Sequence, residues 1–115
     1  MYMFIKKNIA IKFPKEERYE LTTQLLREAL SVPLNIVEGC GRYTDKDFAH
    51  FSDTSLGSIN ESDYCCYVAL ESNYISKEEY DLPNKLCNEV RAMLINFIKY
   101  LRNNHDQPSA SNPWP

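Results

Sequence analysis

A few acids, histidines and cysteines are the residues of this chain whose types and spacing could support catalysis or metal binding. Asp47 and His50 are three positions apart, so a helix would place them on one face, one turn apart. A di-metal centre in a helical bundle needs two Glu-x-x-His sets and further inward-facing carboxylates. The second histidine, His105, lies far along the chain. We therefore expect Asp47 to be a cap acid and His50 to lie on a surface or an interface.

The four cysteines, Cys40, Cys65, Cys66 and Cys87, do not show the spacing of a zinc site. There is no Cys-x-x-Cys pair, and adjacent Cys65 and Cys66 would point about 100° apart on a helix. Free cysteine is a common buried residue in a reducing cell, so we expect small core residues. The sequence also has no Gly-x-Ser-x-Gly motif and no P-loop. We expect no metal, no cofactor and no catalytic residue, and a protein that is not an enzyme.

Several polar residues of the expected helices could form either a binding surface or a structural network. They are Gln24, Arg27, Asn35, Glu38 and Glu61. One interpretation is a polar surface for RNA or a partner protein. We favour the alternative, a hydrogen-bonded network at a seam between helices or subunits, because arginine presents a fork of donors that matches a carboxylate.

Basic residues gather near the first corner of the chain: Lys6, Lys7, Lys12, Lys15 and Arg18. They are candidates for phosphate contact, although a solvated face is the favoured interpretation. Residues 1–42 carry seven Lys and Arg against five Glu, whereas residues 43–75 carry one Lys against six acids. Proteins that bind nucleic acid through its phosphates usually have a strong basic face. In a chain whose net charge is −3, any such face would be local.

Hydrophobic periodicity predicts helices near residues 2–12, 18–40, 44–71 and 77–102. In the first of these segments Ile9, Ile11 and Phe13 also alternate, so a short strand is the weaker alternative. The first helix would be at most ~18 Å long, against about 33 Å for the second. The sequence therefore predicts an all-α fold: an up-down antiparallel four-helix bundle with a shortened first helix.

Prolines and glycines predict where these helices bend, end or approach a neighbour. Pro33 lacks an N–H and should bend the second helix, and Pro83 should delay or bend the fourth. Gly39 and Gly41 should end the second helix, with glycine in the left-handed conformation. Gly57 costs about 1 kcal/mol relative to Ala in mid-helix, which suggests that another backbone passes near it.

The turns carry clearer local signals. Thr44 and Asp47 form a near capping box, and Ser76 and Glu79 form a full one. Asn73 can take the left-handed cap position in place of glycine. The short connection from 71 to 79 forces the third and fourth helices to be antiparallel neighbours.

The apolar stripes predict which helix faces are buried. On the second helix the stripe runs from Leu21 to Cys40 and includes Val37, and on the fourth it includes Leu82 and Met93. The third helix has a seam of small residues that lets a neighbouring helix approach closely: Ser52, Ser55, Ser58, Ser62, Cys66 and Ala69.

The 115 residues are enough for one domain. We expect a helical bundle domain over residues 1–103 and a flexible polar tail over 104–115, in which Trp114 either dangles or anchors onto a partner. No apolar run approaches the ~20 residues that span a bilayer, and the start lacks the pattern of a secretory signal. These features predict a cytoplasmic location and no membrane contact.

Four segments in order, FPKEERYELTTQL, REALSVPLNIVEG, TDKDFAHF and YISKEEY, carry a resemblance to one family. They resemble the four-helix-bundle proteins encoded in intervening sequences of bacterial 23S ribosomal RNA, over about residues 9–102. The positions that match the family are Gln24, Arg27, Asn35, Glu38, Gly39 and Glu61. The family has no established catalytic residue, so the resemblance implies none here.

The resemblance implies assembly into a ring, commonly a homopentamer. It also implies kinship with the accessory protein of diversity-generating retroelements, whose pentamer contacts reverse transcriptase and nucleic acid. Our first hypothesis is therefore a non-enzymatic oligomeric helical-bundle module that acts through a protein or RNA partner. The alternative is an RNA- or DNA-binding accessory factor of the ring-forming type. A short first helix cannot cover the apolar sides of the other three, which independently predicts self-association.

Overall fold

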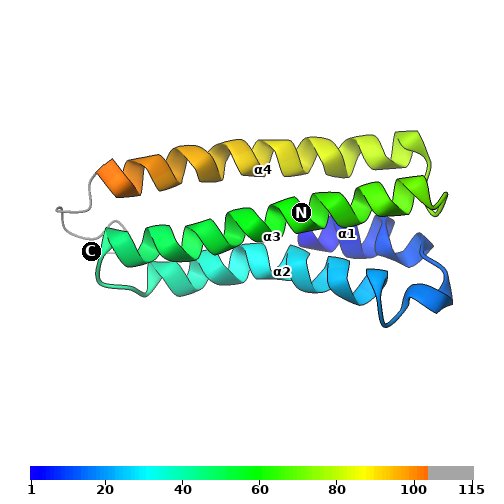
Figure 1. Ribbon diagram of the computed structural model, residues 1–115, viewed down its shortest axis with the longest axis horizontal. Coiled ribbons are helices and arrows are strands. Elements are labelled where there is room, and N and C mark those ends of the chain that lie inside the picture. Colours follow the sequence, from blue (N-terminus) through cyan, green and yellow to red (C-terminus); the bar gives the residue numbers. More distant parts are fainter. Residues whose placement is uncertain (104–115) are drawn as a thin grey trace.

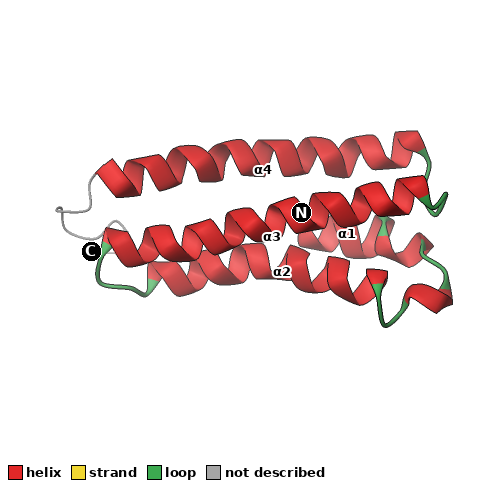
Figure 2. Cartoon of the chain, viewed as in Figure 1, coloured by secondary structure: helices red, strands yellow, loops and turns green. Residues whose placement is uncertain are grey.

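The structure, a computed structural model, describes residues 1–103, and each regular element in that part of the chain is a helix (Figure 2). α1 (Tyr2–Asn8) leads through two short 3-10 helices, η1 (Ala10–Lys12) and η2 (Lys15–Glu17), into α2 (Leu21–Cys40). α3 (Asp45–Glu71) and α4 (Lys77–Asn103) follow. α3 lies between α2 and α4, and α1 lies along one half of the bundle, near the α3–α4 turn (Figure 1). The predicted helical bundle with a short first helix is confirmed. The expectations for His105, Trp114 and the tail lie outside the described residues.

The first helix is shorter than predicted, and the second begins later. α1 ends at Asn8, and η1 carries the chain to Lys12, so the weaker strand alternative is wrong. Ile5 and Ile9, four positions apart, are both buried, which accounts for the helical periodicity of this segment. Pro14 lies in extended backbone and η2 follows it, so α2 starts at Leu21 rather than near 18.

The predicted helix caps are confirmed. The Asp47 N–H donates to Thr44 Oγ1 over 3.1 Å at the start of α3. Before α4, the Glu79 N–H donates to Ser76 Oγ over 3.1 Å, and the Ser76 N–H donates to Glu79 Oε1 over 2.8 Å. Asn73 has φ 61°, the left-handed conformation predicted for this turn. These local contacts fix where the two hairpins reverse.

α2 ends at its C-cap residue Gly41, as predicted, but the left-handed conformation predicted for the glycines and the backbone contact predicted for Gly57 are wrong. Gly41 has φ −83° and continues the right-handed turn after α2, so no left-handed glycine ends the helix. Gly39 is needed for space, because a Cβ there would lie 2.5 Å from Phe48 Cδ1 and 3.2 Å from Phe51 Cβ. Gly57 is exposed, and a Cβ there would meet no atom within 4 Å, so no backbone of the described chain passes near it.

The two prolines lie inside helices. α2 continues through Pro33 to Cys40 and bows along its length (Figure 1). α4 begins at Lys77 and continues through Pro83, so Pro83 does not delay the helix as one prediction had it. The Pro83 ring is fully buried, which offsets part of the cost of its missing N–H donor.

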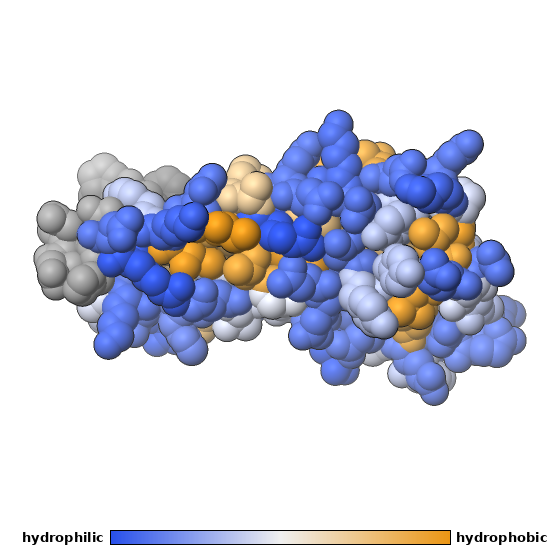
Figure 3. All heavy atoms as spheres, turned by 45° about the horizontal axis from the view of Figure 1, so that its top comes forward, coloured by the Kyte–Doolittle hydropathy of each residue, from blue (hydrophilic) through white to orange (hydrophobic). Residues whose placement is uncertain are grey.

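The core consists of three clusters along the bundle. The first packs α1 against α2 and α3, through Ile5, Ile9, Leu25 and Cys66 among others. The second and third join α3 to α2 and α4 towards the other end. Figure 3, in which α4 comes towards the viewer, shows separate hydrophobic patches among hydrophilic side chains. The stripe predictions are wrong for Val37, Leu82 and Met93, which are exposed.

Buried serines let α2 and α3 pack closely, as the seam of small residues predicted. Ser55 Oγ donates to the Val32 carbonyl over 2.8 Å, immediately before Pro33. Ser58 Oγ donates to Ser31 Oγ over 2.9 Å, and Ser62 Oγ donates to the Ser58 carbonyl over 2.9 Å. These three hydroxyls therefore have partners in positions where a larger side chain would separate the helices. Ser52, also buried in this seam, has no hydrogen-bond partner for its Oγ in the described chain.

Candidate functional site

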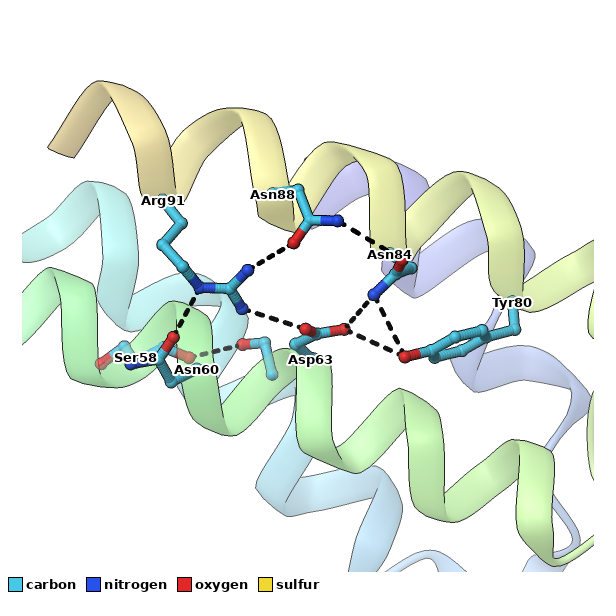
Figure 4. Close-up of polar contacts among 8 residues, drawn as sticks. Ser58, Asn60, Asp63, Tyr80, Asn84, Asn88 and Arg91 are labelled. Atoms are coloured by element: carbon cyan, nitrogen blue, oxygen red, sulfur yellow. Dashed lines mark hydrogen bonds and ion pairs between the residues drawn. The ribbon is translucent and has the colours of Figure 1, made fainter. Parts of the chain in front are cut away.

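A polar seam joins the outer edges of α3 and α4. It consists of Asn60 and Asp63 on α3 and Tyr80, Asn84, Asn88 and Arg91 on α4 (Figure 4). Arg91 Nη2 lies 3.0 Å from Asp63 Oδ2, and the two side chains are 26% and 18% exposed. Arg91 Nε also donates to Asn60 Oδ1 over 2.8 Å. One guanidinium therefore contacts two residues of the neighbouring helix.

The second carboxylate oxygen of Asp63 is also occupied. Asn84 Nδ2 donates to Asp63 Oδ1 over 3.1 Å, and the Tyr80 hydroxyl lies 3.4 Å from the same oxygen. Burial raises the pKa of Tyr80, and the Asp63 carboxylate raises it further, so this hydroxyl stays protonated and donates. Both oxygens of Asp63 are thus bound from α4.

The sequence places these residues together through helical spacing. Positions 80, 84, 88 and 91 follow one face of α4, with separations of four, four and three. We did not predict this seam, although the spacing of Tyr80, Asn84, Asn88 and Arg91 is visible in the sequence. The α3 residues that they contact depend on how the two helices are aligned. The spacing of residues on α4 alone does not determine that alignment.

Two exposed tyrosines lie beside the polar seam on the outer face of α3. Tyr64 is 66% exposed and Tyr67 is 44% exposed. Their ring centroids are 6.2 Å apart, and the Tyr67 ring is 6.3 Å from that of Tyr80. We use the name tyrosine face for Asn60, Glu61, Tyr64 and Tyr67.

Shallow cavities flank Tyr64 on both sides. One of about 330 Å³ lies towards α2 and is lined by Gln24, Asn60, Glu61, Tyr64 and Cys65. The other, of about 240 Å³, lies towards α4 and is lined by Asn60, Asp63, Tyr64, Tyr67 and Tyr80. Both are open hollows at helix seams, so they suit contact with another surface better than enclosure of a small molecule.

The structure brings together two of the five polar residues predicted to form a network. Gln24 Nε2 donates to Glu61 Oε2 over 3.3 Å, across α2 and α3. Asn35 Nδ2 instead bonds Ser31 on its own helix, and Glu38 pairs with Arg42 on the exposed surface at 2.8 Å. Arg27 is exposed. Through Ser31 Oγ, which also accepts from Ser58 of α3, Asn35 still belongs to a hydrogen-bonded network between α2 and α3. Arg27 and Glu38 do not lie at a seam between helices of the chain, and a seam between subunits stays a prediction for them.

The five basic residues proposed for phosphate contact are all exposed: Lys6, Lys7, Lys12, Lys15 and Arg18. They do not form a uniform positive surface. Lys12 forms an ion pair with Glu79 of α4. Lys15 lies in η2 together with Glu16 and Glu17. Glu16, Glu17 and Glu79 therefore offset part of the positive charge of this corner.

Asp47 and His50 are exposed, as predicted for a cap acid and a surface histidine. With Lys46, Ala49 and Arg102 they line a surface cavity of about 680 Å³ at the end of the bundle. Within residues 1–103 no group of three or more His, Cys, Asp or Glu side chains is placed to hold a metal ion. Cys65, Cys66 and Cys87 are buried and Cys40 is half-buried, all as free thiols, which agrees with the sequence prediction.

Fold and site together define a helical-bundle protein whose polar features lie along helix seams and outer faces. The chain belongs to the 23S rRNA-intervening sequence protein family, whose sequence model matches residues 2–96. It is also similar to the crystal structure of a protein of unknown function from the S23 ribosomal protein family of Bacteroides thetaiotaomicron VPI-5482. That similarity has a TM-score of 0.70 and 26% identity, and covers 85% of this chain and 84% of that chain. A comparison with curated proteins gives no match. The predicted family membership is confirmed.

No helix in the described part of the chain is both long enough and apolar enough to cross a membrane.

Proposed function

We propose that this protein is a non-enzymatic module of the cytoplasm that assembles with copies of itself and acts through a protein partner. The observation that carries the self-assembly is an exposed apolar stripe on α2. Leu30, Leu34 and Val37 are 38%, 56% and 68% exposed. They are separated by four and three residues, so they lie on one helix face. Single exposed apolar residues are ordinary, but a contiguous patch indicates an interface.

Charged residues border this stripe. Arg27 lies one turn before Leu30, and Glu38 follows Val37 directly; both side chains are exposed. An apolar centre with a charged rim is the usual composition of a protein–protein interface. This arrangement supports a role for Arg27 and Glu38 at a contact between subunits, now that neither lies at a seam within the chain.

Light scattering of the full chain tests the assembly. We expect a mass that is a multiple of the 13.4 kDa chain, with five copies as the number that the family resemblance implies. Leu34→Glu and Val37→Glu should reduce that mass to the monomer, because each places a charge within the apolar stripe. Tyr19→Glu, at an exposed position outside the regular helices, is the control and should keep the wild-type mass. A wild-type chain that is monomeric at micromolar concentration would contradict the proposal.

We rank nucleic-acid binding second to a protein partner. The corner that would contact phosphate contains Glu16, Glu17 and the Lys12–Glu79 pair, and residues 43–75 are strongly acidic. Carboxylates near the contact reduce the favourable release of counterions on which phosphate binding depends. An accessory factor that binds RNA or DNA is therefore the alternative function.

A further inference from the structure

We propose that the tyrosine face of α3 binds a lysine- and arginine-containing segment of a partner protein. This inference rests on the proposed function, since it names the surface and the chemistry of the partner contact. The first observation is geometric. Gly57, Asn60, Glu61, Tyr64 and Tyr67 are all exposed and follow one another along the side of α3 that faces away from the core.

The two tyrosines give this surface the character of a binding site. An exposed tyrosine supplies a large contact area with few rotatable bonds, so little entropy is lost when a partner orders it. The rings of Tyr64 and Tyr67 lie next to each other, with a cavity on either side of Tyr64. A partner's side chains could therefore enter hollows that already exist on both flanks of one aromatic ring.

The charge around these rings selects a cationic partner. From Gly57 to Ile75 the chain has three acids, Glu61, Asp63 and Glu71, and no Lys or Arg. Asp63 is paired with Arg91, but Glu61 and Glu71 form no ion pair within residues 1–103. Glu28 of α2 lies near Cys65, because both Glu28 and Glu61 raise the pKa of that thiol. Cys65 in turn lines the cavity between Tyr64 and α2. Aromatic faces beside carboxylates attract guanidinium and ammonium groups.

At Gly57 the α3 backbone itself is accessible to a partner, because glycine has no side chain to cover it. It is exposed in mid-helix, where it weakens the helix relative to alanine, and no atom of the described chain lies within 4 Å of a Cβ built there. Packing within the described chain therefore gives no reason for glycine at this position. A segment laid across the tyrosine face could approach the α3 backbone at Gly57 closely.

The same observations disfavour two other occupants. The phosphates of a nucleic acid would be repelled by Glu61 and Glu71. A second copy would offer fewer free cations than a basic segment, because in its basic corner Lys12 is already paired with Glu79 and Lys15 has Glu16 and Glu17 beside it, which leaves Lys6, Lys7 and Arg18.

A binding assay with a defined peptide tests the proposal. The probe is a fluorescein-labelled peptide of three Gly-Arg-Ala-Lys repeats, and its binding to the full chain is followed by fluorescence anisotropy. We expect binding that the Tyr64→Ala/Tyr67→Ala double variant weakens about tenfold and that Glu61→Gln weakens about threefold. The matched controls are Tyr43→Ala, at an exposed tyrosine before α3, and Glu89→Gln, at an exposed acid of α4. Both should stay within about twofold of wild type.

Several results would overturn the proposal. They are no binding at about 1 mM peptide, an equal loss in the control variants, or equal binding of a peptide with glutamate in place of every basic residue. Binding of a labelled DNA oligonucleotide that is lost in the double tyrosine variant would assign the surface to nucleic acid instead.

Light scattering of the same double variant separates this proposal from the assembly proposal. An unchanged mass is expected, because the tyrosine face and the α2 stripe are different surfaces. A fall to the monomer would show that copies of this chain occupy the tyrosine face and would overturn the partner assignment. Circular dichroism must show wild-type helicity for each variant, which is expected because Tyr64, Tyr67 and Glu61 are exposed.

Discussion

Burial alters the acid–base behaviour of three cysteine thiols. It raises the pKa of Cys65 to about 11, with help from Glu28 and Glu61, and that of Cys87 to about 12, with help from Asp63. The pKa of Cys66 is raised as well, chiefly by burial. Thiols with raised pKa values remain protonated at neutral pH, and the protonated form is a poor nucleophile. These cysteines are therefore inert packing groups in the folded chain.

Stability should fall in alkaline solution. A thiol whose pKa is higher in the folded chain than its ordinary value of 9.0 contributes stability that is fully present below about pH 9. That stability is lost as pH rises through 9 towards the folded values near 11 and 12, at up to ~1.4 kcal/mol per pH unit and thiol. Urea unfolding under reducing conditions, between about pH 8 and 10.5, measures this.

The cysteine variants provide the control for this prediction. Cys65→Ala should reduce the alkaline slope, because it removes one of the buried thiols. Cys40→Ala should leave the slope close to wild type, because Cys40 is only half-buried. Equal slopes in the wild-type chain and both cysteine variants would assign the loss of stability to lysine and tyrosine titration instead.

The same substitution at two glycines should have opposite effects. Gly57→Ala should stabilise by up to ~1 kcal/mol, because alanine favours the helix and the new methyl group meets nothing. Gly39→Ala should destabilise by about 1–2 kcal/mol, because its methyl group would collide with Phe48. The Phe48 ring is packed edge-on against Phe97, with 4.9 Å between centroids, and has little room to move. Thermal unfolding of the two variants side by side tests this, and equal shifts would contradict it.

At the scale of elements, the polar seam ties α4 to α3. Its central pair is neither open nor fully buried, so its worth lies between the 0.2–1 kcal/mol typical of surface pairs and the ~3–5 kcal/mol lost when one partner of a buried pair is removed. We expect a coupling energy of about 1–2 kcal/mol between Asp63 and Arg91. A double-mutant cycle with Asp63→Ala and Arg91→Ala measures it by urea unfolding.

The exposed pair of Arg42 and Glu38 is a matched comparison for that cycle. These residues lie one turn apart on the surface of the chain, and their coupling should be below about 0.5 kcal/mol in the monomeric Leu34→Glu background. Similar coupling energies for the two pairs would mean that the seam adds nothing beyond a surface ion pair.

Local patterns predicted the elements well, and contacts between elements poorly. The capping box of Ser76 and Glu79 and the left-handed Asn73 depend on neighbours in the chain, and both are confirmed. Of the two seams that the sequence offers for Glu38, the one between helices of the chain is wrong, because Glu38 is exposed and pairs with Arg42 of the following turn. Its helical face follows from periodicity, but what covers that face depends on the partner helix. The polar seam could not be predicted for the same reason, because its residues belong to two different helices.

At the scale of the whole molecule, the N-terminal part of the sequence and its middle part carry opposite net charges. Residues 1–42 have a small excess of basic groups and residues 43–75 a large excess of acids. We expect weak binding to single-stranded RNA or DNA that falls steeply with salt, with a log–log slope of about −0.7 per phosphate neutralised. Fluorescence anisotropy across a salt series measures this.

Charge reversal locates any such binding. The Lys6→Glu/Lys7→Glu double variant should abolish the weak binding, because these two lysines are exposed on α1. Lys99→Glu, at an exposed position of α4, should have little effect. Tight binding that persists at about 0.5 M salt would place nucleic acid above a protein partner as the main function.

The placement of α3 between α2 and α4 also bears on how the chain reaches its folded state. The close backbone contacts among the long helices join neighbours in the sequence, α2 with α3 and α3 with α4, across short turns. Topologies with such local contacts fold within microseconds to milliseconds, whereas subunit association is slower and depends on concentration. Each chain should therefore complete its helices in a fast, concentration-independent phase and expose Leu34 and Val37 until a second copy arrives.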